Sequence, residues 1–265
     1  MKVWKVFLGI GLTVLIIGIA LLITGLALNG WAFDIDYEMN TFTQEEDATA
    51  LDLNLSSGEM NVQFYPGDKV EITYPTAYNA GYTVTEDNGT ITVKPKEGLR
   101  IHWVWWWNKT PAVTVRIPTS SAMDLKLGLS AGKVTVADGT FNDVDINLSA
   151  GKLNLGNLKC NKFKSHLSAG SLETKALECT TLDLKLSAGS ADLDKITCGY
   201  INVKLSAGSA NLTVVGSLHD YFTSVKKSAG SCNLPEYPVP PGSVGDFKHI
   251  DVSLSAGSVN FQFTD

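Results

Sequence analysis

The chain has 265 residues, of which 44% are hydrophobic, and it carries a formal net charge of −6 at pH 7. This length and hydrophobic content are sufficient for one substantial folded body with a further segment attached to it. The acidic balance argues against nucleic acid as a partner, because binding to a phosphate backbone needs a positively charged surface.

The N-terminal region contains an uncharged segment, residues 7–28, that is long enough to cross a bilayer as one helix. Lys2 and Lys5 precede it and acidic residues follow it, so the positive-inside rule places the N-terminus in the cytoplasm and the remainder outside. A cleaved signal peptide is the alternative, although its apolar core usually has only about 7–15 residues. The prediction is a single-pass cell-membrane protein that contacts the lipid bilayer, with a cytoplasmic stub (1–5), a transmembrane helix (6–28) and a linker (29–48).

The next region, residues 49–123, is expected to form a β-rich N-terminal rung and cap. Leu55-Ser56-Ser57-Gly58 resembles the repeated phrase that follows later in the chain, so residues 51–64 are predicted to form an early rung. Asp87-Asn88-Gly89 lies between two alternating segments and predicts a β-hairpin. Residues 112–117 are typical of another strand.

A cluster of tryptophans lies within this region. Indole rings favour membrane–water boundaries and stack on the apolar faces of ligands, so the cluster is a candidate surface or partner patch. The alternative is a cap that packs on the end of the hydrophobic core. The four residues are Trp103, Trp105, Trp106 and Trp107.

From residue 129 onward, the phrase Leu-Ser-Ala-Gly recurs at a period of 19 residues, starting at Leu129, Leu148, Leu167, Leu186 and Leu205, with looser copies at 227–230 and 254–257. A fixed period near 20 residues indicates stacked repeats, and the alternation of apolar and polar residues within each repeat indicates strands. Residues 124–265 are therefore predicted to form an all-β fold, a right-handed parallel β-helix (β-solenoid) with about 19 residues and three short strands per rung. A proline- and glycine-rich insertion, residues 235–246, interrupts the period, and such insertions often lie on a binding face.

The glycine of each phrase is expected to take a left-handed backbone conformation at one corner of its rung, with the preceding alanine pointing inward. A change such as Gly170→Val should therefore damage folding more than a change at an outward position. The structural turn glycines are Gly58, Gly132, Gly151, Gly170, Gly189, Gly208, Gly230 and Gly257.

Outward positions of the repeat form columns of charged residues. One column alternates in sign, which favours ion pairs between neighbouring rungs: Lys126, Asp145, Lys164 and Asp183. A second is a candidate basic column that either faces an anionic partner or forms a solvated surface that discourages aggregation: His166, Lys185, Lys204 and Lys226.

The four cysteines, Cys160, Cys179, Cys198 and Cys232, fall on inward lines of the repeat and are expected to be structural thiols, with one disulfide as the alternative. A straight column of thiols does not offer the tetrahedral arrangement that a metal requires. No catalytic, phosphate-binding or metal-binding motif is present, so no catalytic residue, metal or cofactor is expected. Paired carboxylates at Asp192 and Asp194 leave a polysaccharide-active enzyme as a remote alternative.

The apolar N-terminal segment, the early Ser-Ser-Gly rung and the Leu-Ser-Ala-Gly-Ser ladder together resemble the bacterial putative-adhesin family, over residues 1–265. The resemblance implies a cell-envelope β-solenoid of unknown biochemical function and offers no catalytic residues; some members accompany envelope stress systems. The function expected is a non-catalytic, membrane-anchored scaffold for surface binding or adhesion, with a cell-wall or membrane-protein partner. The alternative is an accessory or regulatory protein of an envelope stress or signalling system. The sequence does not set the ligand or the oligomeric state.

Overall fold

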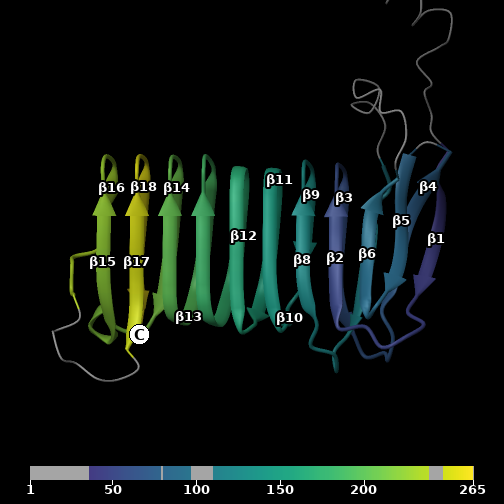
Figure 1. Ribbon diagram of the computed structural model, residues 1–265, viewed down its shortest axis with the longest axis horizontal. Helices are drawn as coiled ribbons and strands as arrows, with labels where there is room; N and C mark the ends of the chain where they lie inside the picture. The colour runs from purple at the N-terminus through teal and green to yellow at the C-terminus, as the bar shows by residue number, and fades with distance from the viewer. Residues whose placement is uncertain (1–35, 79, 97–109, 239–246, 265) are drawn as a thin grey trace, which may run out of the picture. The chain divides into compact units, whose positions relative to one another are not determined.

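The structure is a computed structural model that describes residues 36–78, 80–96, 110–238 and 247–264. One unit, residues 37–99 and 109–265, contains all the strands of these ranges. Eighteen strands join in one continuous hydrogen-bonded sheet, and they stand side by side in Figure 1. Regular structure in the described ranges otherwise consists of a 3-10 helix, Leu218–Asp220.

The repeat forms rungs of about 19 residues, each a chain segment that passes up one side of the unit, turns at the Ser-Ala-Gly corner and returns. In one rung, β8 (Asp124–Leu129) leads through the corner to β9 (Lys133–Val136) and then to the short β10 (Gly139–Thr140). The following rungs comprise β11 (Asp143–Lys159), β12 (Lys162–Leu186), β13 (Ser190–Leu205) and β14 (Ser209–Val215), and β11 and β12 continue through corners instead of breaking into short strands.

Neighbouring rungs pair in parallel and in register with the repeat. Leu148 lies opposite Leu167, and Leu186 lies opposite Leu205. The sequence period therefore sets the register, because a slip of one residue would turn every apolar side chain outward.

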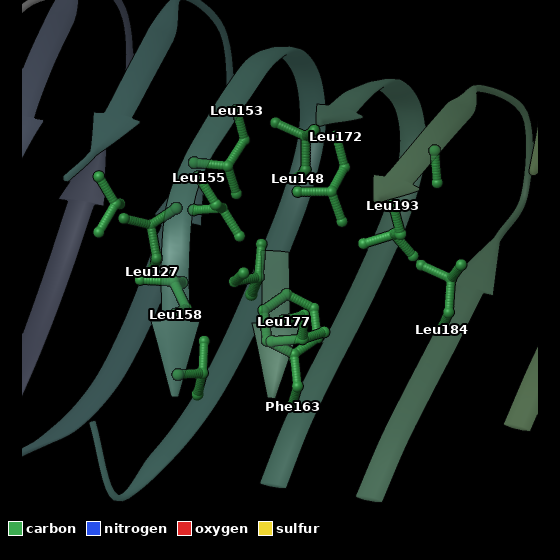
Figure 2. Packing of buried hydrophobic residues seen from close by; sticks show 14 of the residues in the cluster. Leu127, Leu148, Leu153, Leu155, Leu158, Phe163, Leu172, Leu177, Leu184 and Leu193 are labelled. Atoms are coloured by element: carbon green, nitrogen blue, oxygen red, sulfur yellow. The ribbon is translucent and has the colours of Figure 1, made fainter. Parts of the chain in front are cut away.

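The hydrophobic core is a continuous column of leucine, isoleucine, valine and phenylalanine side chains between the strands of each rung. Figure 2 shows Leu153, Leu172, Leu177 and Phe163 directed into this space from β11 and β12. One rung alone cannot enclose its apolar face, so stacking the rungs supplies most of the burial.

The N-terminal part combines parallel and antiparallel strands. β2 (Ala50–Leu55) pairs in parallel with β8 on one side and with β6 (Thr90–Pro95) on the other. In the same way, β3 (Glu59–Tyr65) pairs in parallel with β9 and with β7 (Val113–Pro118). By contrast, β1 (Glu38–Thr43), β4 (Glu71–Ala77) and β5 (Ala80–Asp87) form antiparallel pairs. The predicted hairpin is present between β5 and β6, with positive φ at Asn88 (49°) and Gly89 (72°).

The spatial order of the rungs departs from the chain order at both ends. β2 lies between β6 and β8, although β6 follows β2 in the chain. At the other end, β17 (Lys248–Leu254) lies between β13 and β15 (Tyr221–Lys227). In the same way, β18 (Ser258–Thr264) lies between β14 and β16 (Ser231–Cys232). The last rung of the chain is thus inserted between two earlier ones (Figure 1).

The predicted fold class, a right-handed parallel β-helix preceded by one transmembrane helix, is wrong. A coil of that kind stacks its rungs in chain order and pairs them only in parallel, whereas here the order is interleaved at both ends and β1, β4 and β5 pair antiparallel. The alternating apolar pattern identifies a rung, but it does not say which rung will be its neighbour.

The predicted localisation, a single-pass cell-membrane protein with an outward C-terminal part, is also corrected. Residues 36–78, 80–96, 110–238 and 247–264 form no helix with the length and apolar character needed to span a bilayer. The predicted transmembrane segment, residues 6–28, lies outside the described residues.

The Ser-Ala-Gly corner points away from the core, contrary to the inward alanine predicted from the sequence. Leu129 is buried, Ser130 and Ala131 are exposed, and Val134 is the next buried residue. The corner therefore takes the chain out into solvent and back, and the alternation resumes only after the glycine.

The eight turn glycines form one column, in the spatial order Gly58, Gly132, Gly151, Gly170, Gly189, Gly208, Gly257 and Gly230. Glycine is needed because consecutive corners nearly touch: a Cβ at Gly208 would lie 2.2 Å from the Gly189 carbonyl oxygen. Six of the eight have positive φ, whereas Gly170 and Gly189 do not. The left-handed conformation predicted for those two is wrong, but a Cβ at Gly189 would still lie 2.5 Å from the Gly170 oxygen.

Candidate binding surface

One face of the unit carries the outward side chains of the first strand of each rung. The sign-alternating column predicted from the sequence lies here and begins one rung earlier, at Asp52. Lys126 Nζ is 3.0 Å from Asp52 Oδ2, and Lys164 Nζ is 2.9 Å from Asp145 Oδ2. The predicted alternation is confirmed, and because the pairs are solvent-exposed, each contributes only about 0–1 kcal/mol to stability.

The predicted basic column lies beside it but is not continuous. Lys185 and Lys204 are directly opposite each other. Ser253 of β17 separates Lys204 from Lys226, because β17 lies between β13 and β15. His166 lies opposite Asn147. The structure therefore brings together two lysines of this column, and a serine interrupts it before the third.

The tryptophan patch predicted from the sequence, Trp103, Trp105, Trp106 and Trp107, lies outside the described residues. Most of the proline- and glycine-rich insertion, residues 239–246, lies outside them as well. From the part of the insertion that is described, Tyr237 forms an antiparallel bridge with Thr223 of β15.

Four aromatic side chains, which we call the aromatic patch, gather at the end of this face: Tyr200, Phe222, Phe247 and His249. The interleaved strand order creates the patch, because β17 places His249 directly between Tyr200 of β13 and Phe222 of β15. Ring centroids lie 6.3 Å apart for Tyr200 and His249, and 5.9 Å apart for Phe222 and His249. Phe222 and Phe247 meet edge to face at 4.9 Å. Tyr200 is 38% exposed and Phe247 37%, so the rings are open to a ligand.

Polar groups lie at the margin of the aromatic patch. The Tyr200 hydroxyl donates a hydrogen bond of 2.6 Å to Asp251 Oδ2. This bond, together with partial burial, raises the pKa of Tyr200 to about 12, so the hydroxyl stays protonated at neutral pH. In the same columns, Asn202 donates to Asp183 across 3.1 Å, and Lys204 is exposed. The patch thus combines apolar ring faces with carboxylate and amide groups held by hydrogen bonds and with an exposed ammonium group.

The aromatic patch was not predicted from the sequence. Tyr200 occupies an outward position where the earlier rungs carry Asp143, Lys162 and Thr181, so in the sequence it is one exposed residue among polar ones. Its neighbours arrive only through β15 and β17, which flank the insertion. One pattern in the sequence could have indicated the patch. The outward position that is polar in the earlier rungs is aromatic in the last three, as Tyr200, Phe222 and His249.

A second feature is an open groove of about 510 Å³ along the corner that follows the second strand of each rung; we call it the thiol groove. Cys160, Cys179 and Cys198 line it, together with Lys159 and Glu178. Cys179 and Cys198 are buried, as the structural-thiol interpretation expects, whereas Cys160 and Cys232 are only half-buried. All four cysteines are unbridged, and within the described ranges no group of three or more His, Cys, Asp or Glu side chains is placed to hold a metal ion.

The profile of the Toastrack DUF4097 family matches residues 48–234, well over half of the chain. The chain belongs to the Toastrack DUF4097 family. Its resemblance to the bacterial putative adhesins is thereby confirmed. The matched residues of this Toastrack chain begin just before β2 and end just after β16, so the match includes the interleaved strands β2, β6 and β8 but not the inserted strands β17 and β18.

The chain is similar to solved structures from Bacteroides fragilis and Parabacteroides distasonis. A structure from Bacteroides fragilis, described as a putative adhesin, is 12% identical with a TM-score of 0.52 and covers 86% of the Toastrack chain and 97% of its own. A putative adhesin from Parabacteroides distasonis is 11% identical, with a TM-score of 0.44 and coverage of 85% and 98%. A structure from the same species described as a putative lipid binding protein is 10% identical, with a TM-score of 0.43 and coverage of 86% and 97%.

The first of these likenesses shows the fold of the Toastrack chain alone, since the identity is low, and the other two are too distant to support an argument. None of the three is described as an enzyme. A comparison with curated proteins finds no match.

Proposed function

We propose that this Toastrack chain is a non-catalytic, adhesin-like binding protein whose aromatic patch contacts a cell-wall glycan. The observation that carries the proposal is the gathering of Tyr200, Phe222, Phe247 and His249 on one exposed face by strands from three different rungs. A family relation to putative adhesins supports the general role, and the glycan is an inference from the chemistry of the patch.

The chemistry of the patch suits a sugar polymer. Pyranose rings have apolar C–H faces that stack on aromatic rings, and their hydroxyls need hydrogen-bond partners around the rim. Asp251 and Asn202 supply acceptors and a donor beside Tyr200, and both are already held by hydrogen bonds. Such groups bind with little loss of side-chain entropy, because their positions are set before the ligand arrives.

A binding role without catalysis fits the arrangement of charges on this face. Hydrolysis of a glycosidic bond needs two carboxyl groups converging on one bond, one of them able to donate a proton. The carboxylates of this face lie in two neighbouring columns, Asp52 and Asp145 in one and Asp124 and Asp143 in the other, and Asp52 and Asp145 pair with lysines. The role proposed for them is to keep the face soluble and in register.

The test is co-sedimentation of the full-length chain with insoluble bacterial peptidoglycan as the probe. Tyr200→Ala combined with Phe247→Ala should weaken binding by about 5- to 150-fold, since each lost stacking contact is worth about 0.5–1.5 kcal/mol. Tyr78→Ala is the matched control, because Tyr78 is 91% exposed and belongs to the connection between β4 and β5.

Equal binding by the double variant and the wild type would remove the aromatic patch from the proposal. If no variant binds peptidoglycan but the chain retains a membrane protein, the accessory role replaces the adhesin-like one. Release of new reducing ends from the polymer would overturn the non-catalytic assignment.

A further inference from the structure

We propose that Cys179 and Cys198 form a redox-active dithiol that closes to a disulfide when a hydroperoxide reaches the thiol groove. The proposal does not rest on the glycan-binding function, because its chemistry uses different side chains, although the Cys198 thiol donates to the backbone oxygen of Tyr200 at 3.1 Å.

The two cysteines are direct neighbours on adjacent parallel segments, in register with each other. Their Sγ atoms are 3.3 Å apart, with the Cys179 thiol donating to Cys198. Strands in a sheet are about 4.8 Å apart. That spacing falls within the range of about 4.4–6.8 Å between Cα atoms that a disulfide tolerates. A bond between them therefore needs side-chain rotation and no change of register.

The thiol groove gives a small oxidant access to the pair. Cys179 and Cys198 line the groove although their side chains are largely covered. A hydroperoxide is small enough for such an opening, whereas a folded redox partner would have to reach two residues that are each less than a tenth exposed.

The hydrogen bonds around the pair shift the pKa values of the two thiols in opposite directions. The hydrogen bond from Cys179 lowers the pKa of the Cys198 thiol. Hydrogen bonds with Cys160 and Cys198 raise the pKa of Cys179, which therefore keeps its proton. The Cys198 thiol can itself donate to the carbonyl oxygens of Tyr200 at 3.1 Å and Thr180 at 3.4 Å, so it carries a proton in the resting pair. Its sulfur is the one that accepts the hydrogen bond from Cys179, and this bond stabilises the thiolate once that proton has left, so we take Cys198 as the attacking residue.

The reaction balances with hydrogen peroxide as the oxidant. The Cys198 sulfur attacks one peroxide oxygen, the O–O bond breaks, and the leaving hydroxide takes the proton that the Cys198 thiol gives up, so Cys198 sulfenic acid and one water form. The Cys179 sulfur then attacks the sulfenic sulfur, an S–S bond forms, and the displaced hydroxide takes the Cys179 proton to leave as a second water. Two thiols are oxidised by two electrons, and one peroxide is reduced to two waters.

The other cysteines provide the controls. Cys160 lies in the same groove but is half-buried and one rung away, next to Cys179. Cys232 lies in β16, opposite Val259 rather than another cysteine. Cys160 and Cys198 flank Cys179 on opposite sides, and the pair proposed here is the one whose residues are both buried and whose Sγ atoms are 3.3 Å apart. The 179–198 disulfide should therefore form when Cys160 or Cys232 is changed to serine.

The experiment treats the reduced full-length chain with hydrogen peroxide at low protein concentration, alkylates the remaining thiols and maps the peptides by mass spectrometry. We expect one intramolecular disulfide between Cys179 and Cys198, formed also in Cys160→Ser and Cys232→Ser. Cys179→Ser should instead accumulate sulfenic acid at Cys198, trapped by dimedone, because the resolving thiol is gone.

Three outcomes would overturn the proposal. The first is full alkylation of all four cysteines after oxidation of a chain whose circular dichroism is unchanged. The second is a disulfide that forms only between molecules or only through Cys160 or Cys232. The third is faster loss of the Cys179 thiol than of the Cys198 thiol when the other has been changed to serine.

Discussion

At the scale of single residues, the corner glycines show how closely one rung lies against the next. The amide of Ser209 donates to the Gly189 carbonyl oxygen at 3.0 Å, in the same corner where a Cβ on Gly208 would meet that oxygen. A side chain at Gly208 would therefore displace a backbone hydrogen bond as well as strain its own φ of +107°.

Gly208→Ala should lower the free energy of unfolding by roughly 3 kcal/mol, the sum of a left-handed backbone strain of about 1–2 kcal/mol and an overpacking cost of at least about 1 kcal/mol. Gly199→Ala is the matched control, because its φ is not left-handed and its nearest contact, the Thr180 oxygen, is at 3.5 Å. Urea unfolding followed by circular dichroism measures both. Equal losses in the two variants would show that corner contact is not the cause.

At the scale of elements, β15 is an edge strand of the stack, and its sequence is adapted to that position. It pairs with β17 on one side, and on the other the described residues provide only the bridge between Thr223 and Tyr237. Exposed edge strands are sites of unwanted pairing, and lysines are a common protection. Lys226 and Lys227 are both exposed there, which explains why lysine replaces the leucine that the repeat has at position 227.

Changing Lys226 and Lys227 together to valine should cause concentration-dependent association, because the edge would lose its charge and gain β-propensity. Light scattering across a concentration series measures this. Lys185→Val with Lys204→Val is the control, since those lysines lie on strands paired on both sides. Association of the control to the same extent would attribute the effect to lost net charge instead of edge exposure.

The elements themselves could be predicted from the sequence, but their order could not. The alternation in residues 124–205, the hairpin at Asn88-Gly89 and the 19-residue register are local or periodic signals, and each is present in the structure. The choice of neighbour for β13 is different: Thr223-Ser224-Val225 and Ile250-Asp251-Val252 both offer an alternating strand of the right length. The hydrophobic core determines which strand becomes the neighbour of β13. β17 supplies Leu254, which is buried, whereas β15 has the exposed Lys227 at the same position.

The candidate site depended on that same choice. The charge column could be predicted because its members are exactly one repeat apart within the regular rungs, whereas the aromatic patch joins Tyr200, Phe222 and His249 across an irregular spacing. The basic column was predicted with Lys226 next to Lys204, and the insertion of β17 places Ser253 between them. Because the spacing is irregular in this part of the chain, the sequence predicted neither the aromatic patch nor the serine that interrupts the basic column.

At the scale of the whole molecule, the stack is a series of interfaces between neighbouring rungs, and stability should vary along it. Rungs in β11 and β12 have a partner on both sides and a fully buried core, whereas β1 and β15 lie at ends with fewer partners. In such repeat architectures, each rung is stabilised by its own contacts and those of its immediate neighbours.

Amide hydrogen exchange should therefore be slowest in 163–186 and faster by at least an order of magnitude in 38–43 and 221–227, as measured by mass spectrometry of peptic fragments. Leu177→Ala, at a fully buried position, should cost about 2–5 kcal/mol and accelerate exchange most in its own rung and the adjacent ones. Uniform exchange along the stack would instead mean that it opens as a single cooperative unit.

The interleaved C-terminal end also constrains when the molecule can be completed. Chains emerge from the ribosome N-terminus first, and domains generally fold in that order. Here β13 must leave one edge without its final partner while β15, β16 and the insertion are synthesised, because its neighbour β17 ends only at Leu254. The stack is closed by β17 and β18, and until they are synthesised the edge of β13 can pair with any other strand of similar pattern.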